Sequence, residues 1–168
     1  MFALGIDPGL SRCGYGAVRA ASGKLSAVAA GHLTTPSDEP TAARLYTLLV
    51  DLRQLVASLG PDVVVVERVL FQANVRTAMA VGQASGVALA VAAEAGIPVA
   101  EYSPNEVKQA VAGYGSAGKG QVQRMVQVLL GLVEPPRPAD QADALALAIC
   151  HLAGFRLRAA TSAARCGP

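Results

Sequence analysis

The chain contains few aromatic, cysteine and histidine residues. Of its 168 residues 4% are aromatic, and tryptophan is absent, which argues against a sugar cleft lined by aromatic platforms. Cys13, Cys150 and Cys166 form no CxxC pair, and their odd number favours reduced thiols. We therefore expect a cytoplasmic protein. His32 and His151 are the two histidines, which is too few to favour a zinc site.

Charged residues are also scarce, at 15% of the chain, and the formal net charge is +2. The longest apolar tract, 77–100, is interrupted by Gln83, Ser85 and Glu94, so we expect no membrane span. With 52% hydrophobic residues and no low-complexity tract, the composition predicts one compact domain. We place this domain at residues 1–157, followed by a basic and flexible tail over 158–168.

Basic side chains gather in two stretches of the sequence. They are Lys108, Lys119 and Arg124, and then Arg156, Arg158 and Arg165. If the acidic residues gather around a metal ion, the remaining surface is basic and suits a polyanionic partner. An ordinary scatter of surface charges is the alternative interpretation.

The hydrophobic pattern predicts the order β-β-β-α-β-α-β-α-α-α. Turn residues separate the first three strands, a 3.6-residue apolar stripe marks the first helix, and four valines form a strand buried on both faces. Right-handed crossovers place the valine strand beside the first strand, with the last strand outside it. The pattern thus predicts an α/β fold with a mixed five-stranded sheet flanked by helices. The expected strands are 2–6, 14–19, 25–33, 63–66 and 98–102, and the expected helices include 73–95 and 139–155.

Four carboxylates stand at the ends of these elements. Asp7 ends the first strand and Glu67 ends the valine strand beside it. Asp140 and Asp143 lie three residues apart at the start of the last helix, so they share one side of it. Each has an ordinary alternative role: Asp7 as a turn former, Glu67 as a solvated strand end, and the last pair as acids at the helix dipole.

The last helix is apolar on nearly every side, which weakens the solvated interpretation of its two acids. Leu147 and Cys150 continue the side of the acids, and Leu145 and Ile149 lie opposite, so both sides need cover. Acids at the head of a covered helix need water or cations to neutralise them. Mg²⁺ prefers oxygen ligands, and two ions about 3.5–4 Å apart can clamp the attacking water and the leaving oxygen of a phosphodiester.

Four sequence blocks between residues 5 and 151 resemble, in order, those of the RuvC family of Holliday-junction resolvases. Together they cover nearly the whole chain. The blocks are Gly5-Ile6-Asp7-Pro8-Gly9 with Gly14-Tyr15-Gly16; Glu67 with Phe71, Asn74 and 81–86; Val107-Lys108-Gln109-Ala110-Val111 with Gly113, Gly115 and Lys119; and 140–146, Asp-Gln-Ala-Asp-Ala-Leu-Ala.

The resemblance implies a single ribonuclease H-like nuclease domain that nicks four-way DNA junctions symmetrically in recombination and repair. It implies Mg²⁺, or Mn²⁺, as two ions per site, held by Asp7, Glu67, Asp140 and Asp143. It also implies phosphate contacts by Lys108 and Lys119, a homodimer, and a branch-migration helicase as partner.

The second block departs from the family pattern. The family often has an aromatic residue three positions after the glutamate, where this chain has Leu70, with Phe71 next. We expect the stretch from Leu70 to Arg76 to contact DNA, with either Leu70 or Phe71 against the bases. Packing of Phe71 under the following loop is the alternative.

Two further interpretations concern function and assembly. A ribonuclease H-fold RNA nuclease or antitermination factor would lack the block with two lysines, and a catalytically silent junction binder would not need four acids. A ridge of small residues recurs every four positions and suggests either a homodimer contact or close packing on the protein's own sheet. It consists of Ala78, Gly82, Gly86 and Ala90.

Overall fold

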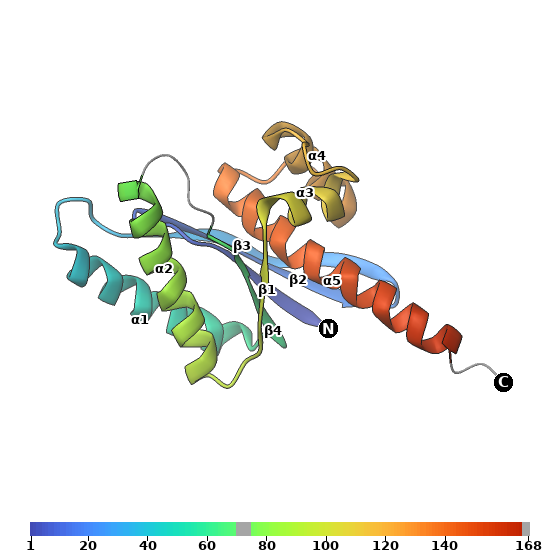
Figure 1. Cartoon of the computed structure of the whole chain (residues 1–168), viewed down its shortest axis with the longest axis horizontal. Helices are drawn as coiled ribbons and strands as arrows, with labels where there is room; N and C mark the ends of the chain where they lie inside the picture. Colours follow the sequence, from blue (N-terminus) through green and yellow to red (C-terminus); the bar gives the residue numbers. More distant parts are fainter. Residues whose placement is uncertain (70–74, 166–168) are drawn as a thin grey trace.

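The computed structural model describes residues 1–69 and 75–165, without the side chains of Arg76 and of 155–165. The element order is the one predicted (Figure 1). The strands are β1 (Phe2–Asp7), β2 (Arg12–Ala21), β3 (Lys24–Thr34), β4 (Val63–Glu67) and β5 (Val99–Tyr102). The helices are α1 (Thr41–Leu59), α2 (Val75–Glu94), α3 (Pro104–Ala112), α4 (Lys119–Leu130) and α5 (Ala139–Arg165).

The five strands form one mixed sheet in the order β3-β2-β1-β4-β5. β1 pairs antiparallel with β2 and parallel with β4, and β5 continues the parallel part. This arrangement confirms the predicted fold and strand order. Since β1 and β4 run in parallel, their carboxyl ends lie at the same edge of the sheet.

The sheet separates two hydrophobic cores. Side chains alternate between its faces, because successive residues of a strand point in opposite directions. Leu4 and Val64 pack with α1 and α2 on one face, whereas Ala3 and Val65 pack with α5 on the other. Helices α3 and α4 lie over α5 as a further layer (Figure 1).

Helix α5 is sandwiched between the sheet and the layer of α3 and α4. Residues Ala144 to Ile149 are each exposed by 2% or less, which agrees with a sequence that is apolar on every side. The helix continues to Arg165, ten residues beyond its predicted end at Phe155. Residues 156–165 are mostly alanine, arginine and leucine, which favour helix, and contain no proline or glycine. The flexibility expected for 158–168 stays a prediction.

Helix α2 packs by one face and exposes the other. Its stretch 77–94, with a mean hydropathy of 1.2, is long and apolar enough to span a membrane. Ala84, Ala88 and Val91 are nevertheless buried in the core that α2 forms with α1 and the sheet. A Cβ atom added to Gly82 or Gly86 would meet no heavy atom of the described residues within 4 Å. The ridge of small residues therefore does not face the protein's own sheet, which rules out that interpretation.

Candidate active site

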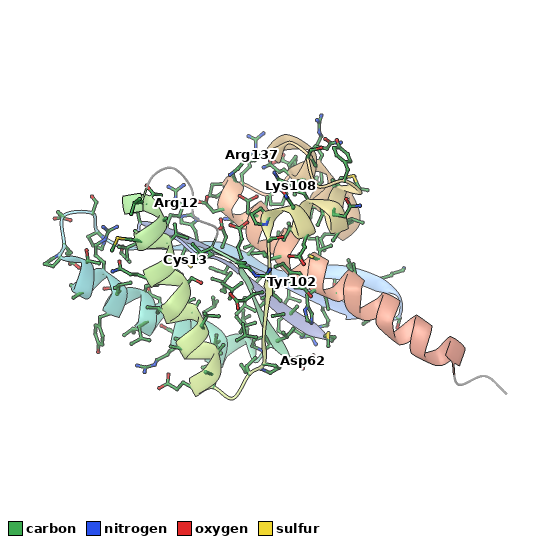
Figure 2. The ribbon with its side chains drawn as sticks, in the orientation of Figure 1. Arg12, Cys13, Asp62, Tyr102, Lys108 and Arg137 are labelled. Carbon is green, nitrogen blue, oxygen red and sulfur yellow. The ribbon has the colours of Figure 1, made fainter. Side chains whose placement is uncertain are left out.

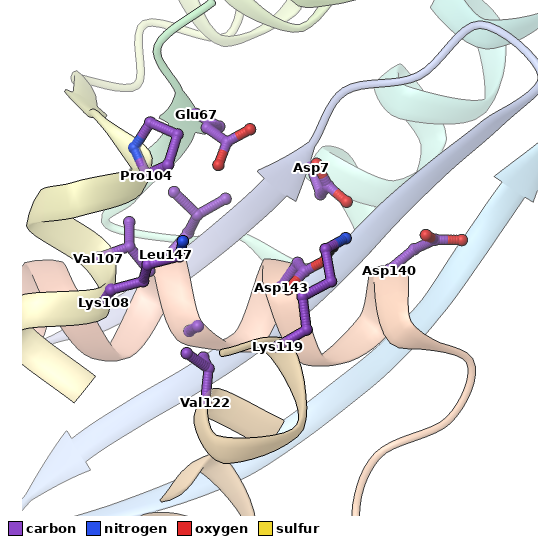
Figure 3. A pocket seen from close by; sticks show the side chains of 11 residues that line it. Asp7, Glu67, Pro104, Val107, Lys108, Lys119, Val122, Asp140, Asp143 and Leu147 are labelled. Carbon is purple, nitrogen blue, oxygen red and sulfur yellow. Dashed lines mark ion pairs between the residues drawn. The ribbon is translucent and has the colours of Figure 1, made fainter. Parts of the chain in front are cut away.

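The four predicted carboxylates line one cavity of about 320 Å³ at the carboxyl end of β1 and β4 (Figure 3). Side chains two or four positions apart on a strand point to the same face of the sheet. Asp7 therefore points to the same face as Ala3, and Glu67 to the same face as Val65, which is the face that α5 covers. Asp140 and Asp143 reach the cavity from the first turn of α5. The structure thus brings together residues separated by 136 positions in the chain.

Three strand glycines allow the backbone of α5 to lie directly on the sheet. Gly14 pairs with Asp7 across β1 and β2, and Gly5 pairs with Gly16. A Cβ atom added to Gly14 would clash with the carbonyl oxygen of Asp140, and one added to Gly5 would clash with that of Ala144. These contacts fix the height of the two α5 aspartates above Asp7. Sequence analysis did not assign this role, although glycine inside a strand often marks a close backbone approach.

Burial and mutual repulsion disfavour the charged forms of three carboxylates in the cavity, those of Asp7, Glu67 and Asp143. Burial, followed by the charges of Asp143, Glu67 and Asp140, raises the pKa of Asp7 to about 7. Burial is also the main cause that raises the pKa of Glu67 and that of Asp143. A positive charge in the cavity would therefore stabilise the ionised forms of these carboxylates.

Basic side chains supply part of this positive charge. Lys119 Nζ lies 3.5 Å from Asp143 Oδ2, and its charge lowers the pKa of Asp143 against the effect of burial. Lys108 lines the same cavity from α3 (Figure 3). At the outer side, Arg12 Nη1 lies 3.5 Å from Asp140 Oδ2. The two α5 aspartates thus each have a cationic side chain from another element.

Local sequence signals position the two lysines. Ser103 caps α3 in a capping box with Glu106, and Pro104 follows at the first helical position. Lys108 is one turn further along α3. Lys119 is the first residue of α4, whose N-cap is Gly118. Both lysines therefore extend from the early turns of helices that pack on α5.

The donor set of the cavity fits a hard divalent cation. Its polar lining consists of four carboxylates and two amines, and carboxylate oxygens are the ligands that Mg²⁺ and Mn²⁺ prefer. Within residues 1–69 and 75–165, however, no three His, Cys, Asp or Glu side chains lie close enough together to hold one ion. The Asp140 carboxylate points away from Lys119 (Figure 3), toward its ion pair with Arg12. A metal ion held by several of these carboxylates would therefore require side-chain rotation.

The stretch predicted to contact bases lies mostly outside the described part of the chain. Leu70 and Phe71 fall in the gap between residues 69 and 75, and the Arg76 side chain is likewise not described.

Comparisons with known proteins identify the family of this chain. The family model "Crossover junction endodeoxyribonuclease RuvC" matches residues 3–151. The crossover junction endodeoxyribonuclease RuvC of Moorella thermoacetica is 54% identical over 151 residues, covering 90% of this chain and 90% of its own. The structure of Thermus thermophilus RuvC superposes with a TM-score of 0.85 at 38% identity, and its complex with a Holliday junction substrate with a TM-score of 0.88 at 38% identity. Each covers 94% of this chain and 96% of the matched chain. The chain belongs to the RuvC family of crossover junction endodeoxyribonucleases.

Proposed function

We propose that this protein is an endodeoxyribonuclease that resolves four-way DNA junctions by paired, symmetric nicks in recombination and repair. The observation that carries the proposal is the cavity itself, where four carboxylates from β1, β4 and α5 face two lysines from α3 and α4. Family membership supports the same substrate, since the superposed Thermus thermophilus protein forms a complex with a Holliday junction substrate.

We propose Mg²⁺ as the cofactor, with Mn²⁺ as a possible substitute and two ions per site. Asp7, Glu67, Asp140 and Asp143 would hold them, because these four carboxylates line one cavity and carboxylate oxygens are the ligands that Mg²⁺ prefers. Bound divalent ions supply an activated water nucleophile and stabilise the charge that develops on the leaving oxygen.

The protein's own residues bind and orient the phosphodiester. Lys108 and Lys119 present ammonium groups at the mouth of the cavity, where they attract the DNA backbone. The ionised carboxylates repel the same phosphates when no cation neutralises them. A Lys119 that exchanges its ion pair with Asp143 for one with a phosphate would leave Asp143 available to the metal, which would link metal uptake to the binding of DNA.

We also propose a two-fold homodimer. Resolution of a four-way junction requires two nicks on symmetry-related strands, and a C₂ dimer supplies two sites with one self-complementary patch. The ridge of small residues on α2 lies at the surface, and Met79 on the same helix is 62% exposed. Sedimentation equilibrium at micromolar protein tests this assembly, and a monomer that still nicks both strands together would contradict it. A branch-migration helicase as partner rests on the family resemblance.

The test of function is to incubate the protein with a synthetic four-way junction, with and without Mg²⁺, and to map the nicks. We expect symmetric nicks that need Mg²⁺ and that disappear in Asp7→Asn and Asp143→Asn, while junction binding survives. Asp38→Asn, in an exposed turn away from the cavity, is the matched control and should cleave normally. Preferential cleavage of single-stranded RNA would favour the RNA-nuclease alternative. Binding of junctions without any cleavage would identify a silent binding module.

A further inference from the structure

Arg12 holds Asp140 at the outer side of the cavity. It is the first residue of β2, immediately after the turn that follows Asp7, and its guanidinium forms an ion pair with Asp140 at 3.5 Å. Figure 2 shows Arg12 in the same upper half of the molecule as Lys108, with Asp62 at the opposite end. The Arg12 side chain is 53% exposed and that of Asp140 is 31% exposed, so the pair is open to solvent and can separate.

The ion pair competes with the function expected of Asp140. A carboxylate oxygen bound to a guanidinium is partly neutralised, and its carboxylate is turned outward (Figure 3). A divalent cation that recruits Asp140 must replace Arg12 or share the carboxylate with it. Because like charges repel, an arginine at this distance also disfavours a second cation next to it.

We propose that Arg12 is an internal counter-ion that competes with the divalent metal for Asp140 and is released to a DNA phosphate when the metal binds. This inference deepens the proposed function, because it rests on a metal centre that includes Asp140. Arg12 is a positioning residue in this scheme, since it acts on the metal through Asp140.

A second observation shows where the released side chain would act. Arg12 also lines a neighbouring surface groove, together with Gly9, Ser11 and Thr77, between the turn after β1 and the first half of α2. Arg12 therefore contacts Asp140 of the carboxylate cavity and also lines this groove. A guanidinium fits a phosphate well because its planar donors form two parallel hydrogen bonds.

Calorimetric titration of the full-length protein with Mn²⁺ in the absence of DNA tests the competition. We expect Arg12→Gln to bind Mn²⁺ about two- to fivefold more tightly than the unaltered protein, the range for loss of an exposed ion pair. Arg12→Lys keeps the charge and should stay near the unaltered protein. Arg53→Gln is the matched control, because Arg53 forms an exposed pair with Glu94 at 2.6 Å on α1 and α2, and it should not change Mn²⁺ affinity.

Unchanged or weaker Mn²⁺ affinity in Arg12→Gln would overturn the inference. Asp7→Asn tests separately whether the cavity is the metal site. If this variant binds Mn²⁺ as tightly as the unaltered protein, the cavity is not the metal site. The proposed function then fails together with the inference.

Junction binding tests the release. The affinity for a four-way junction is measured as a function of salt, once in EDTA and once in Ca²⁺, a hard divalent cation with the same oxygen preference. We expect Arg12→Gln to lower the salt slope by about one in Ca²⁺ and to leave it unchanged in EDTA, where Arg12 stays on Asp140. An equal slope for the variant and the unaltered protein in Ca²⁺, or the same reduction in both conditions, would refute release.

Discussion

Replacing Asp7 by asparagine should stabilise the fold when no divalent cation is bound. Burial and three neighbouring carboxylates raise the pKa of Asp7 from 3.8 to about 7. A carboxyl group whose pKa is raised in the folded state favours folding in its protonated form, so its contribution is fully present below the unfolded pKa of 3.8 and is lost as the pH rises through 7. Above that pH, the charge of Asp7 opposes folding.

The displacement of the pKa gives the size of this effect. A difference of one pKa unit corresponds to about 1.4 kcal/mol, so the displacement from 3.8 to about 7 corresponds to an upper limit of about 4 kcal/mol. Rotation of the neighbouring carboxylates and entry of water lower this value, and we expect Asp7→Asn to gain about 2–4 kcal/mol at pH 8. Asparagine keeps the shape and removes the charge.

Urea denaturation in EDTA, at pH 4.5 and at pH 8, is the assay. The gain of Asp7→Asn over the unaltered protein should be small at pH 4.5 and large at pH 8. Asp38→Asn is the control, because Asp38 is exposed and lies outside the cavity. Mg²⁺ should reverse the order, since an ion that binds only the folded, unaltered protein stabilises it by mass action. Equal or lower stability of Asp7→Asn at pH 8 in EDTA would refute the electrostatic reasoning.

Three further substitutions test other parts of the site. Lys119→Ala should weaken junction binding and lower its salt slope by about one, as a filter-binding titration would show, and an unchanged slope would mean that Lys119 touches no phosphate. Gly14→Ala should cost about 1–3 kcal/mol in urea denaturation and reduce cleavage, because the new methyl group pushes Asp140 from the sheet. Gly120→Ala is its control, because a Cβ atom added there has no heavy atom of the described residues within 4 Å. Equal free energies of unfolding for Gly14→Ala and Gly120→Ala would contradict the argument from close contact. Phe71→Ala should lose junction cleavage but keep Mn²⁺ binding, since stacking on a base is worth about 1–3 kcal/mol; early melting with normal cleavage would show that Phe71 is a core residue.

The order of elements and the position of the acids could be read from the sequence because both follow from local patterns. Alternation and β-branched runs identify β1 and β4, and parallel pairing of these strands places Asp7 beside Glu67. The apolar surroundings of Asp140 and Asp143 predicted a helix covered on both sides, and α5 is buried in that way. The capping box at Ser103 is a local sequence signal for the start of α3.

Other features depend on contacts between distant segments, and no local pattern encodes them. The pairing of Arg12 with Asp140 joins residues 128 positions apart, and that of Lys119 with Asp143 joins two different helices. The end of α5 was placed too early because Phe155 ends the strongly apolar stretch, whereas the backbone remains helical to Arg165. The helix propensity of residues 156–165 favours this continuation.

The contact of α5 with Gly5, Gly14 and Gly16 has a consequence for how this protein can vary. Because the close contacts at these glycines involve main-chain atoms of α5, the spacing between strand and helix should depend little on which aliphatic side chains fill the two cores. Core residues elsewhere can therefore drift in size and change the melting temperature while the active site keeps its dimensions. At these three glycines, a larger side chain should lower both the melting temperature and the rate of DNA cleavage.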